Sequence, residues 1–193
     1  MVHIAEASRY LIPALWLIWA IGWTAGAFRV KRTQWRETHG RAVYNRIPVL
    51  LGVIMLLRPQ WLPAGLTRRF VPPGPELPAL GTALVFLGIF FALWARWHLG
   101  GNWSGTITVK EGHTLITTGP YRWVRHPIYT GMVVALLGTA LAIGAPYGFV
   151  GTGLVLLGFI VKLSVEEARM RETFPAEYAD YCRHTARLIP GVF

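Results

Sequence analysis

Polar and charged side chains collect between two hydrophobic blocks in one stretch of the chain, His113 to Tyr129, which reads HTLITTGPYRWVRHPIY. The stretch ends by running Arg125, His126 and Pro127 straight into a long apolar segment. A helix that begins at Pro127 offers unpaired backbone N–H groups and a partial positive charge, and Arg125 and His126 add donors in front of it. The sequence therefore predicts a site here for an anion such as a carboxylate or a phosphate.

An acidic pair, Glu166 and Glu167, lies at the far end of the same apolar segment. Glu166 offers a negative charge suited to an ammonium group, so a ligand that carries both charges, such as an amino acid moiety, would fit between the two positions. Three aromatic residues of the first stretch, Tyr121, Trp123 and Tyr129, are suited to cover a flat ring or a cation. These residues make no nucleophile–base pair, which favours a site that holds a reactive cofactor.

Simpler interpretations exist for most of these residues. Lys162 and Glu166 lie four residues apart, which fits an intrahelical ion pair, and Glu167 makes a second such pair with Arg171. We interpret Glu167 as a structural residue. Basic residues before a membrane helix also anchor lipid phosphate, and tyrosine and tryptophan are common at membrane interfaces. The nine tryptophans need no functional explanation under this interpretation.

The composition is that of a membrane protein. Of the 193 residues, 53% are hydrophobic and only 15% are charged, which is wrong for an ordinary soluble domain. The basic residues behind the net charge of +10 sit in short connections between apolar segments, which favours affinity for anionic lipid headgroups over nucleic acid. The single cysteine, Cys182, excludes an intramolecular disulfide and a cysteine-based zinc site, and the six histidines show no metal-ligand spacing. We predict no structural metal.

Five apolar segments must position these residues, and we interpret them as transmembrane helices. The predicted spans are residues 10–28, 42–62, 77–95, 127–143 and 147–162. The second span includes Arg46, which must snorkel to the interface. The first span is too long for a signal-peptide core and lacks a basic flank before it, so we expect it to stay in the mature protein. The fold prediction is an all-α, polytopic membrane helix bundle in a single domain, residues 1–193, with a small cytoplasmic cap that binds the cofactor.

The basic residues of the first connection predict the orientation. Between positions 29 and 46 the chain carries six arginines and lysines against one acid, so this connection is predicted to be cytoplasmic and the N-terminus to be outside. The 96–126 segment and the C-terminal tail are then cytoplasmic too, at the inner membrane if the cell is bacterial. Because spans four and five form an antiparallel pair, Arg125-His126 and Glu166-Glu167 are predicted to lie close together at this interface.

Three further segments have features of their own. Residues 58–78 contain six prolines and are predicted to form an irregular external loop. Residues 99–119 carry β-branched residues in short runs around a Lys-Glu-Gly turn, which indicates a small hairpin-like loop over the bundle. The fifth helix is predicted to continue beyond the membrane as a polar helix from Lys162 through Arg171.

These residues also carry a resemblance to a known family. HTLITTGPYRWVRHPIYTG, the acidic pair and the C-terminal FPAEYADYCRHTARLIPGVF, together with LGGNWSGTITVKEGH upstream, resemble the isoprenylcysteine carboxyl methyltransferases over about residues 97–193. The resemblance implies a multi-helix membrane enzyme that binds S-adenosylmethionine in this half and methylates a lipophilic acceptor from the bilayer. The cofactor contacts that it implies by position are His113, Thr114, Leu115, Ile116, Tyr121, His126, Pro127, Ile128, Tyr129 and Glu166. We add Arg125 to them on the charge argument above.

Lys162 stands where the family usually has an arginine near the acceptor, four residues before the first glutamate. Lysine keeps the charge but loses the bidentate fork, which weakens recognition of a carboxylate. A carboxylate acceptor is already ionised at neutral pH, whereas a thiol would need a proton acceptor, for which His126 is the candidate. We therefore predict Lys162 and His126 as the catalytic residues.

The reaction that we favour is carboxyl O-methylation of an isoprenylcysteine-like acceptor. The alternatives are methylation of a thiol or of a phospholipid amine, a sterol-reductase-like oxidoreductase that uses NADPH, and a non-catalytic lipid-binding protein. The predicted partners are the lipophilic acceptor and membrane lipids, with no nucleic acid and no obligate protein partner.

Overall fold

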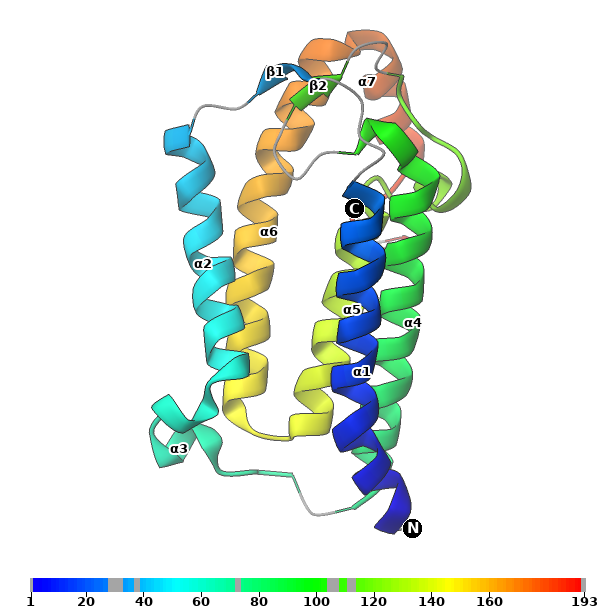
Figure 1. Cartoon of the computed structure of the whole chain (residues 1–193). Coiled ribbons are helices and arrows are strands. Elements are labelled where there is room, and N and C mark those ends of the chain that lie inside the picture. Colours follow the sequence, from blue (N-terminus) through cyan, green and yellow to red (C-terminus); the bar gives the residue numbers. More distant parts are fainter. Residues whose placement is uncertain are drawn as a thin grey trace.

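The computed structural model describes residues 2–27, 33–36, 39–71, 74–103, 108–110 and 114–191. Most of these residues form five long helices, α1 (Val2–Ala27), α2 (His39–Leu57), α4 (Glu76–Leu99), α5 (Pro127–Ile143) and α6 (Pro146–Thr173). The shorter elements are α3 (Ala64–Thr67), α7 (Pro175–His184), the 3-10 helices η1 (Pro59–Trp61), η2 (Gly100–Asn102) and η3 (Gly119–Arg122), and the strands β1 (Thr33–Arg36) and β2 (Thr108–Lys110). Helices α1, α4 and α5 stand together on one side of the bundle and α2 with α6 on the other, with α7 and the strands at one end and α3 at the opposite end (Figure 1).

The outer surface of this bundle is apolar. Leu17, Ile21, Leu50, Phe86 and Phe90 are each more than half exposed, although such side chains are usually buried in a soluble protein. Helices α4 and α6 are long and apolar enough to cross a membrane by length and composition. These features agree with the predicted helical membrane bundle. That all five long helices cross the membrane, and in which direction, stays a prediction.

Proline and glycine fix where the helices around the polar residues begin and end. Pro127, Pro146 and Pro175 occupy the first positions of α5, α6 and α7, where a missing N–H costs nothing. Gly144 ends α5 with φ of 65°, a left-handed conformation that glycine adopts without strain. The predicted break between the last two spans is therefore a tight turn, and α5 and α6 run antiparallel.

Pairs of glycines bring α4 and α5 into close contact. A Cβ atom on Gly131 would lie 2.5 Å from the carbonyl oxygen of Gly88, and one on Gly138 would lie 2.5 Å from that of Gly81. Both helices carry these glycines seven residues apart, which places each pair on one face. Small residues at such a contact let two membrane helices pack backbone to backbone. This contact fixes α5, whose first turn carries much of the predicted site.

Some element boundaries differ from the predicted ones. Helix α1 extends the first predicted span back to Val2, and α2 begins at His39 and ends at Leu57 instead of running over 42–62. Pro59 accounts for the early end, because it begins the 3-10 helix η1. The predicted irregular loop of 58–78 thus contains two short helical turns, η1 and α3. The polar extension of the last span is confirmed, since α6 continues to Thr173.

The predicted local hairpin within residues 99–119 is wrong. Strand β2 pairs antiparallel with β1, in a register that sets Thr33 opposite Lys110 and Arg36 opposite Thr108. The β-branched residues at 108–110 do form a strand, but their partner comes from the connection between α1 and α2, which lies at the same end of the bundle. Residues 111–113 of the predicted turn lie outside the described residues.

Candidate active site

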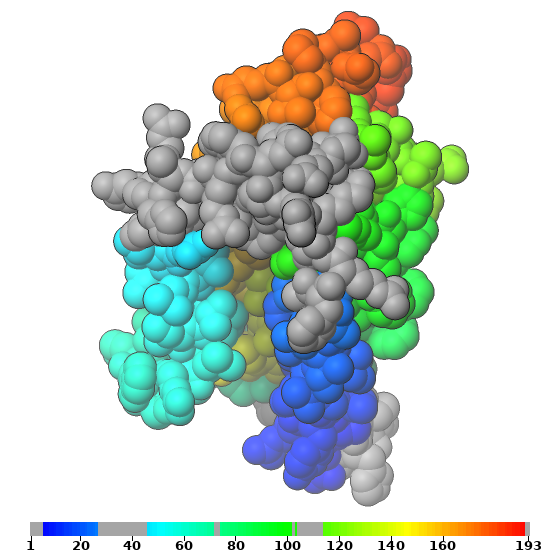
Figure 2. Space-filling view, turned by 45° about the horizontal axis from the view of Figure 1, so that its top comes forward, coloured from blue at the N-terminus to red at the C-terminus, as the bar shows by residue number. Residues whose placement is uncertain are grey.

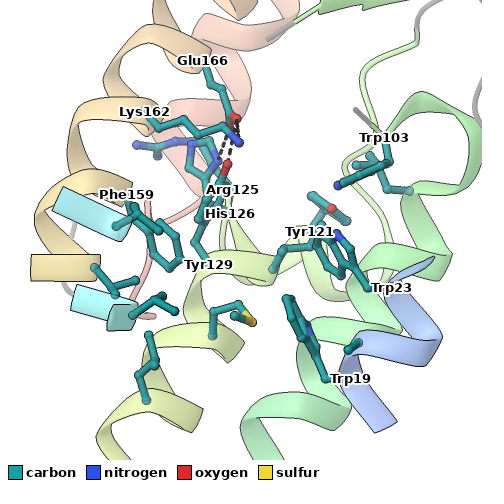
Figure 3. Close-up of a pocket in the computed structure, with 18 of the residues that line it drawn as sticks. Trp19, Trp23, Trp103, Tyr121, Arg125, His126, Tyr129, Phe159, Lys162 and Glu166 are labelled. Carbon is teal, nitrogen blue, oxygen red and sulfur yellow. Dashed lines mark hydrogen bonds and ion pairs between the residues drawn. The ribbon is translucent and has the colours of Figure 1, made fainter. Parts of the chain in front are cut away.

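A cavity of about 910 Å³ lies among α1, α2, α5 and α6. The bundle is hollowed between α1 and α2, and α6 forms the back of this hollow (Figure 2). Polar side chains from the start of α5 and from α6 gather at one end of the cavity, while the opposite wall is aromatic (Figure 3). The polar lining residues at this end are Arg125, His126, Tyr129, Lys162 and Glu166. The juxtaposition that the antiparallel spans predict is therefore present.

Glu166 is the carboxylate of this polar end. It accepts a 2.8 Å hydrogen bond from the Tyr129 hydroxyl across the α5–α6 interface. Its other oxygen lies 3.8 Å from Nδ1 of His126, and Lys162 one turn earlier on α6 forms the predicted ion pair at 3.8 Å. The glutamate side chain is 23% exposed, so it is reachable from the cavity. The structure thus leaves a half-buried negative charge beside the first turn of α5.

Glu167, the next residue, points into the protein instead. It is 4% exposed, forms an ion pair with Arg125 at 3.1 Å, and makes a hydrogen bond with Nε2 of His126 at 3.2 Å. Arg171 and Arg187 join it at 3.3 and 3.4 Å. Glu167 does not line the cavity. These contacts support its interpretation as a structural residue, and the predicted pair with Arg171 is confirmed.

The C-terminal segment holds the start of α5 in place. The backbone N–H of Arg125 donates to the Ala186 carbonyl at 2.8 Å, and that of His126 donates to Arg187 at 3.2 Å. The Thr130 hydroxyl donates to the Leu188 carbonyl at 2.7 Å. The tail after α7 therefore sets the position of the polar residues without lining the cavity itself.

The guanidinium of Arg125 makes several hydrogen bonds within the protein. Besides Glu167, it donates to the carbonyl of Thr185 and, at 3.5 Å, to that of Cys182. Burial opposes the charge of Arg125, but Glu167 outweighs it and raises the pKa of the guanidinium above its ordinary value. Arg125 does line the cavity, yet the donors described here are directed at the protein. Its role in binding an anion stays a prediction.

Tyr121 forms the wall opposite Glu166. It is 7% exposed, and its hydroxyl donates to the Ala95 carbonyl at 3.4 Å while its own carbonyl accepts from the Tyr181 hydroxyl at 2.5 Å. Burial raises the pKa of Tyr121 well above its ordinary value, so the phenol stays neutral. Thr114, Leu115, Ile116 and Ile128, which are predicted cofactor contacts, also line the cavity, whereas Pro127 is fully buried and does not. His113 lies outside the described residues.

Trp123 does not join this wall. Its ring is 45% exposed and stacks on Phe91, with ring centroids 6.4 Å apart, and it meets Trp94 edge-on at 5.6 Å. Trp123 is not among the residues that line the cavity. The proposal that it covers a ring or a cation there therefore has no support from its position.

The sequence prediction missed the apolar part of the cavity. A row of tryptophans lines one wall, and aliphatic side chains of α2 and Phe159 of α6 line the facing one. The members of the row are Trp16, Trp19, Trp23 and Trp103. These four tryptophans line the cavity, a placement that the sequence analysis did not predict. The spacing of the first three, at i, i+3 and i+7, predicts one helix face and was the available signal.

Comparison with known proteins identifies the chain. A family model described as phospholipid methyltransferase matches residues 77–177, which contain nearly all of α4 and the whole of α5 and α6. The chain belongs to this family. The match covers the polar end of the cavity, whereas α1 and α2, which supply part of its apolar walls, lie outside it.

Similar proteins from other organisms have isoprenylcysteine methyltransferase names. The chain is 36% identical over 116 residues to the protein-S-isoprenylcysteine O-methyltransferase of Saccharomyces cerevisiae, a match that covers 58% of this chain and 48% of the yeast protein. It is 30% identical over 138 residues to the rat protein of the same name, covering 68% of this chain and 49% of that one. The chain thus spans about half the length of these relatives. The predicted resemblance to the isoprenylcysteine carboxyl methyltransferases is confirmed.

A solved structure shares the fold. The eukaryotic intramembrane Ras methyltransferase, an isoprenylcysteine carboxyl methyltransferase, superposes with a TM-score of 0.51 at 20% sequence identity. The match covers 81% of this chain and 54% of the other. The helical bundle is therefore one that is found in an integral membrane protein.

Proposed function

We propose that the chain is a membrane methyltransferase that uses S-adenosylmethionine to methylate the carboxylate of an isoprenylcysteine-like lipid. The observation that carries this proposal is one continuous cavity with a polar end beside Glu166 and an apolar part that opens between α1 and α2. A water-soluble donor and a lipid acceptor must meet in such an enzyme, and this cavity has a region suited to each. The names of the yeast and rat relatives support the same reaction.

The residues at the polar end fit S-adenosylmethionine. Its amino acid moiety carries an ammonium group, which Glu166 and the Tyr129 hydroxyl would hold, and a carboxylate, for which the first turn of α5 offers unpaired N–H groups. The adenine would lie against Leu115, Ile116 and Tyr121, which are apolar or neutral. When bound, the cofactor supplies an electrophilic methyl group. We propose that this end of the cavity faces the cytoplasm, as the basic first connection predicts.

The acceptor carboxylate needs a positive charge but no base. Lys162 lines the cavity, lies 5.6 Å from the centroid of the Tyr129 ring and is 24% exposed. Its ammonium group would attract the acceptor carboxylate and orient it in line with the methyl group, and such orientation contributes up to roughly 7–11 kcal/mol to a rate. A thiol acceptor would instead pass its proton to His126, which lies between the two glutamates.

A phospholipid amine is the second candidate acceptor. The matching family model is described as phospholipid methyltransferase, and Lys162 lacks the fork that binds a carboxylate at two points. Glu166 would then serve the amine as well as the cofactor. The two candidates differ in the role of Lys162, because a cation favours a carboxylate and repels an ammonium group.

The test is a methyl-transfer assay with radiolabelled S-adenosylmethionine on purified protein in liposomes. The panel contains isoprenylcysteine acids, thiols and phosphatidylethanolamine, and NADPH is offered as a competitor of the cofactor. We expect label in the isoprenylcysteine ester, a loss of about tenfold or more in Lys162→Met, and recovery in Lys162→Arg. Arg169→Met, on the same helix but away from the cavity, is the matched control. Label in the phospholipid alone would favour the second candidate, and displacement of the cofactor by NADPH would contradict both.

A further inference from the structure

Arg96 has the largest side chain among the fully buried residues, and it is 2% exposed. It lies in the last turn of α4, at the end of a helix that is long and apolar enough to cross a membrane. Burying a cation in such a place is costly unless its donors and charge are compensated. Neither the sequence motifs nor the chemistry proposed above uses this residue, so its contacts require another explanation.

The compensation comes from two helix ends. The Arg96 guanidinium donates to the carbonyl of Gly26, one residue before the end of α1, and at 3.2 Å to that of Gly100, which follows α4. Carbonyls at a helix C-terminus lack intrahelical partners and carry the negative end of the helix dipole. In the described part of the chain the partners of Arg96 are thus carbonyls and aromatic rings, not carboxylates.

The same guanidinium stands behind one wall of the cavity. Its central carbon lies 4.1 Å from the centroid of the Trp103 ring and 6.0 Å from that of Trp23. These two rings meet edge-on, with centroids 5.2 Å apart at 85°. Both line the cavity and face Lys162 and Phe159 across it (Figure 3). The Trp23 ring also packs against the Trp19 ring, with centroids 5.2 Å apart. The aromatic wall therefore extends from the polar end of the cavity into its apolar part.

We propose that Arg96 is a positioning residue for the methyl acceptor. By holding Trp103, Trp23 and the end of α1 together, it fixes the aromatic wall against which the acceptor lies, without touching the acceptor itself. This inference rests on the proposed function and names a determinant of acceptor affinity within it.

The cofactor wall next to it is fixed by other bonds. Tyr121 is held through the backbone carbonyl of Ala95 and by the Tyr181 hydroxyl, and neither bond involves the Arg96 side chain. Glu166 is held by Tyr129 from the other side of the cavity. Trp23 and Trp103 do pack against the cluster that contains Tyr121. Loss of the Arg96 side chain should therefore weaken binding of the acceptor more than binding of the cofactor, whereas a purely structural role would weaken both by a similar factor.

The experiment compares Arg96→Met and Arg96→Lys with the wild type in liposomes, measuring KM and kcat for the isoprenylcysteine acid and the Kd of S-adenosylmethionine by calorimetry. We expect Arg96→Met to raise the acceptor KM about tenfold, with kcat and the cofactor Kd changed by less than about threefold. Arg96→Lys should fall between, because an ammonium group keeps the charge but not the planar fork. Trp97→Leu is the matched control, since Trp97 is the next residue on α4 and is 65% exposed.

A second variant covers the case in which Arg96→Met does not fold. Trp103→Leu leaves the bonds from Arg96 to the two helix ends in place and removes the ring, so it should raise the acceptor KM by a similar factor. An unchanged acceptor KM in Trp103→Leu, or equal losses of acceptor and cofactor affinity in Arg96→Met, would overturn the inference alone. A wild-type protein that binds the cofactor but methylates no isoprenylcysteine acid would overturn the proposed function together with it.

Discussion

Glu166 and Glu167 are neighbours in the chain, and the structure predicts opposite consequences for the same substitution at each. Glu167→Gln removes a charge that is 4% exposed and surrounded by cations, whereas Glu166→Gln removes a half-buried charge at the polar end of the cavity. Glutamine preserves the volume of the side chain. Differences in stability and cofactor affinity between the two variants will therefore result from the lost charge and its contacts, not from changed packing.

The expected magnitude at Glu167 follows from its partners. Arg125 and His126 are each 10% exposed and lie 3.1 and 3.2 Å from the Glu167 carboxylate. Removing one partner of a buried ion pair costs about 3–5 kcal/mol, because the other charge remains buried. Arg125 keeps the carbonyls of Thr185 and Cys182 as acceptors, so we expect the lower end, about 3 kcal/mol. For a chain of this length that corresponds to a fall in Tm of roughly 6–12 °C.

Glu166→Gln should behave differently. Its carboxylate contacts the Tyr129 hydroxyl and Lys162 at an accessible position, so we expect Tm to change by less than about 3 °C. Binding of S-adenosylmethionine should weaken by about tenfold or more, because Glu166, the partner that we propose for its ammonium group, loses its charge. Glu172→Gln provides the matched control on the same helix, since Glu172 is 66% exposed and pairs only locally with Arg169.

The assay is thermal unfolding of the detergent-solubilised variants, followed by tryptophan fluorescence, together with calorimetric titration of the cofactor. We expect a double dissociation: stability falls in Glu167→Gln, and cofactor affinity falls in Glu166→Gln at wild-type stability. A Glu167→Gln variant as stable as the wild type would refute the ion cluster as a support of the site. Unchanged cofactor binding in Glu166→Gln would refute the assignment of the polar end.

Two further variants test how the site is held. Tyr129→Phe removes the 2.8 Å hydrogen bond that orients Glu166. We expect cofactor binding to weaken about fivefold in the same titration, with little change in Tm. A loss of stability without a loss of affinity would contradict this expectation. Gly131→Ala places a Cβ 2.5 Å from the Gly88 carbonyl and should lower stability by about 1–3 kcal/mol in thermal unfolding. Gly153→Ala is its control, since nothing lies within 4 Å of the added Cβ, and it should stabilise by up to about 1 kcal/mol.

The polar half of the site could be predicted because its residues are unusual in a membrane chain. Each long apolar segment was visible as a helix, and Pro127 and Gly144 mark where α5 begins and ends. Antiparallel connectivity then brings the start of α5 next to the polar end of α6. The contact between Tyr129 and Glu166 is a consequence of that topology, although the direction in which each glutamate points is not. That choice depends on Arg125, Arg171 and Arg187, which come from three separate segments.

The pairing of β2 could not be predicted for a related reason. A run of three β-branched or long residues at 108–110 can pair with any exposed strand edge, and a nearby turn predicts pairing with the segment that follows it in the chain. The distant partner at 33–36 becomes available only because α1 and α4 both end at this side of the bundle. Proximity in space then decides the pairing, not proximity in the chain.

The apolar half of the cavity shows a deeper limit of sequence reasoning in membranes. In a soluble protein, a tryptophan on an apolar helix face predicts burial, but in a bilayer the lipid-facing side of a helix is apolar as well. Trp19 lines the cavity whereas Leu17 and Ile18 on the same helix are more than half exposed, and hydropathy does not separate them. The buried Arg96 marks one part of this wall, because a cation at the end of a membrane helix must have partners, and its partners are Trp23, Trp103 and the end of α1. In such a chain, a buried charged residue with no motif around it therefore indicates which apolar wall to test by mutation.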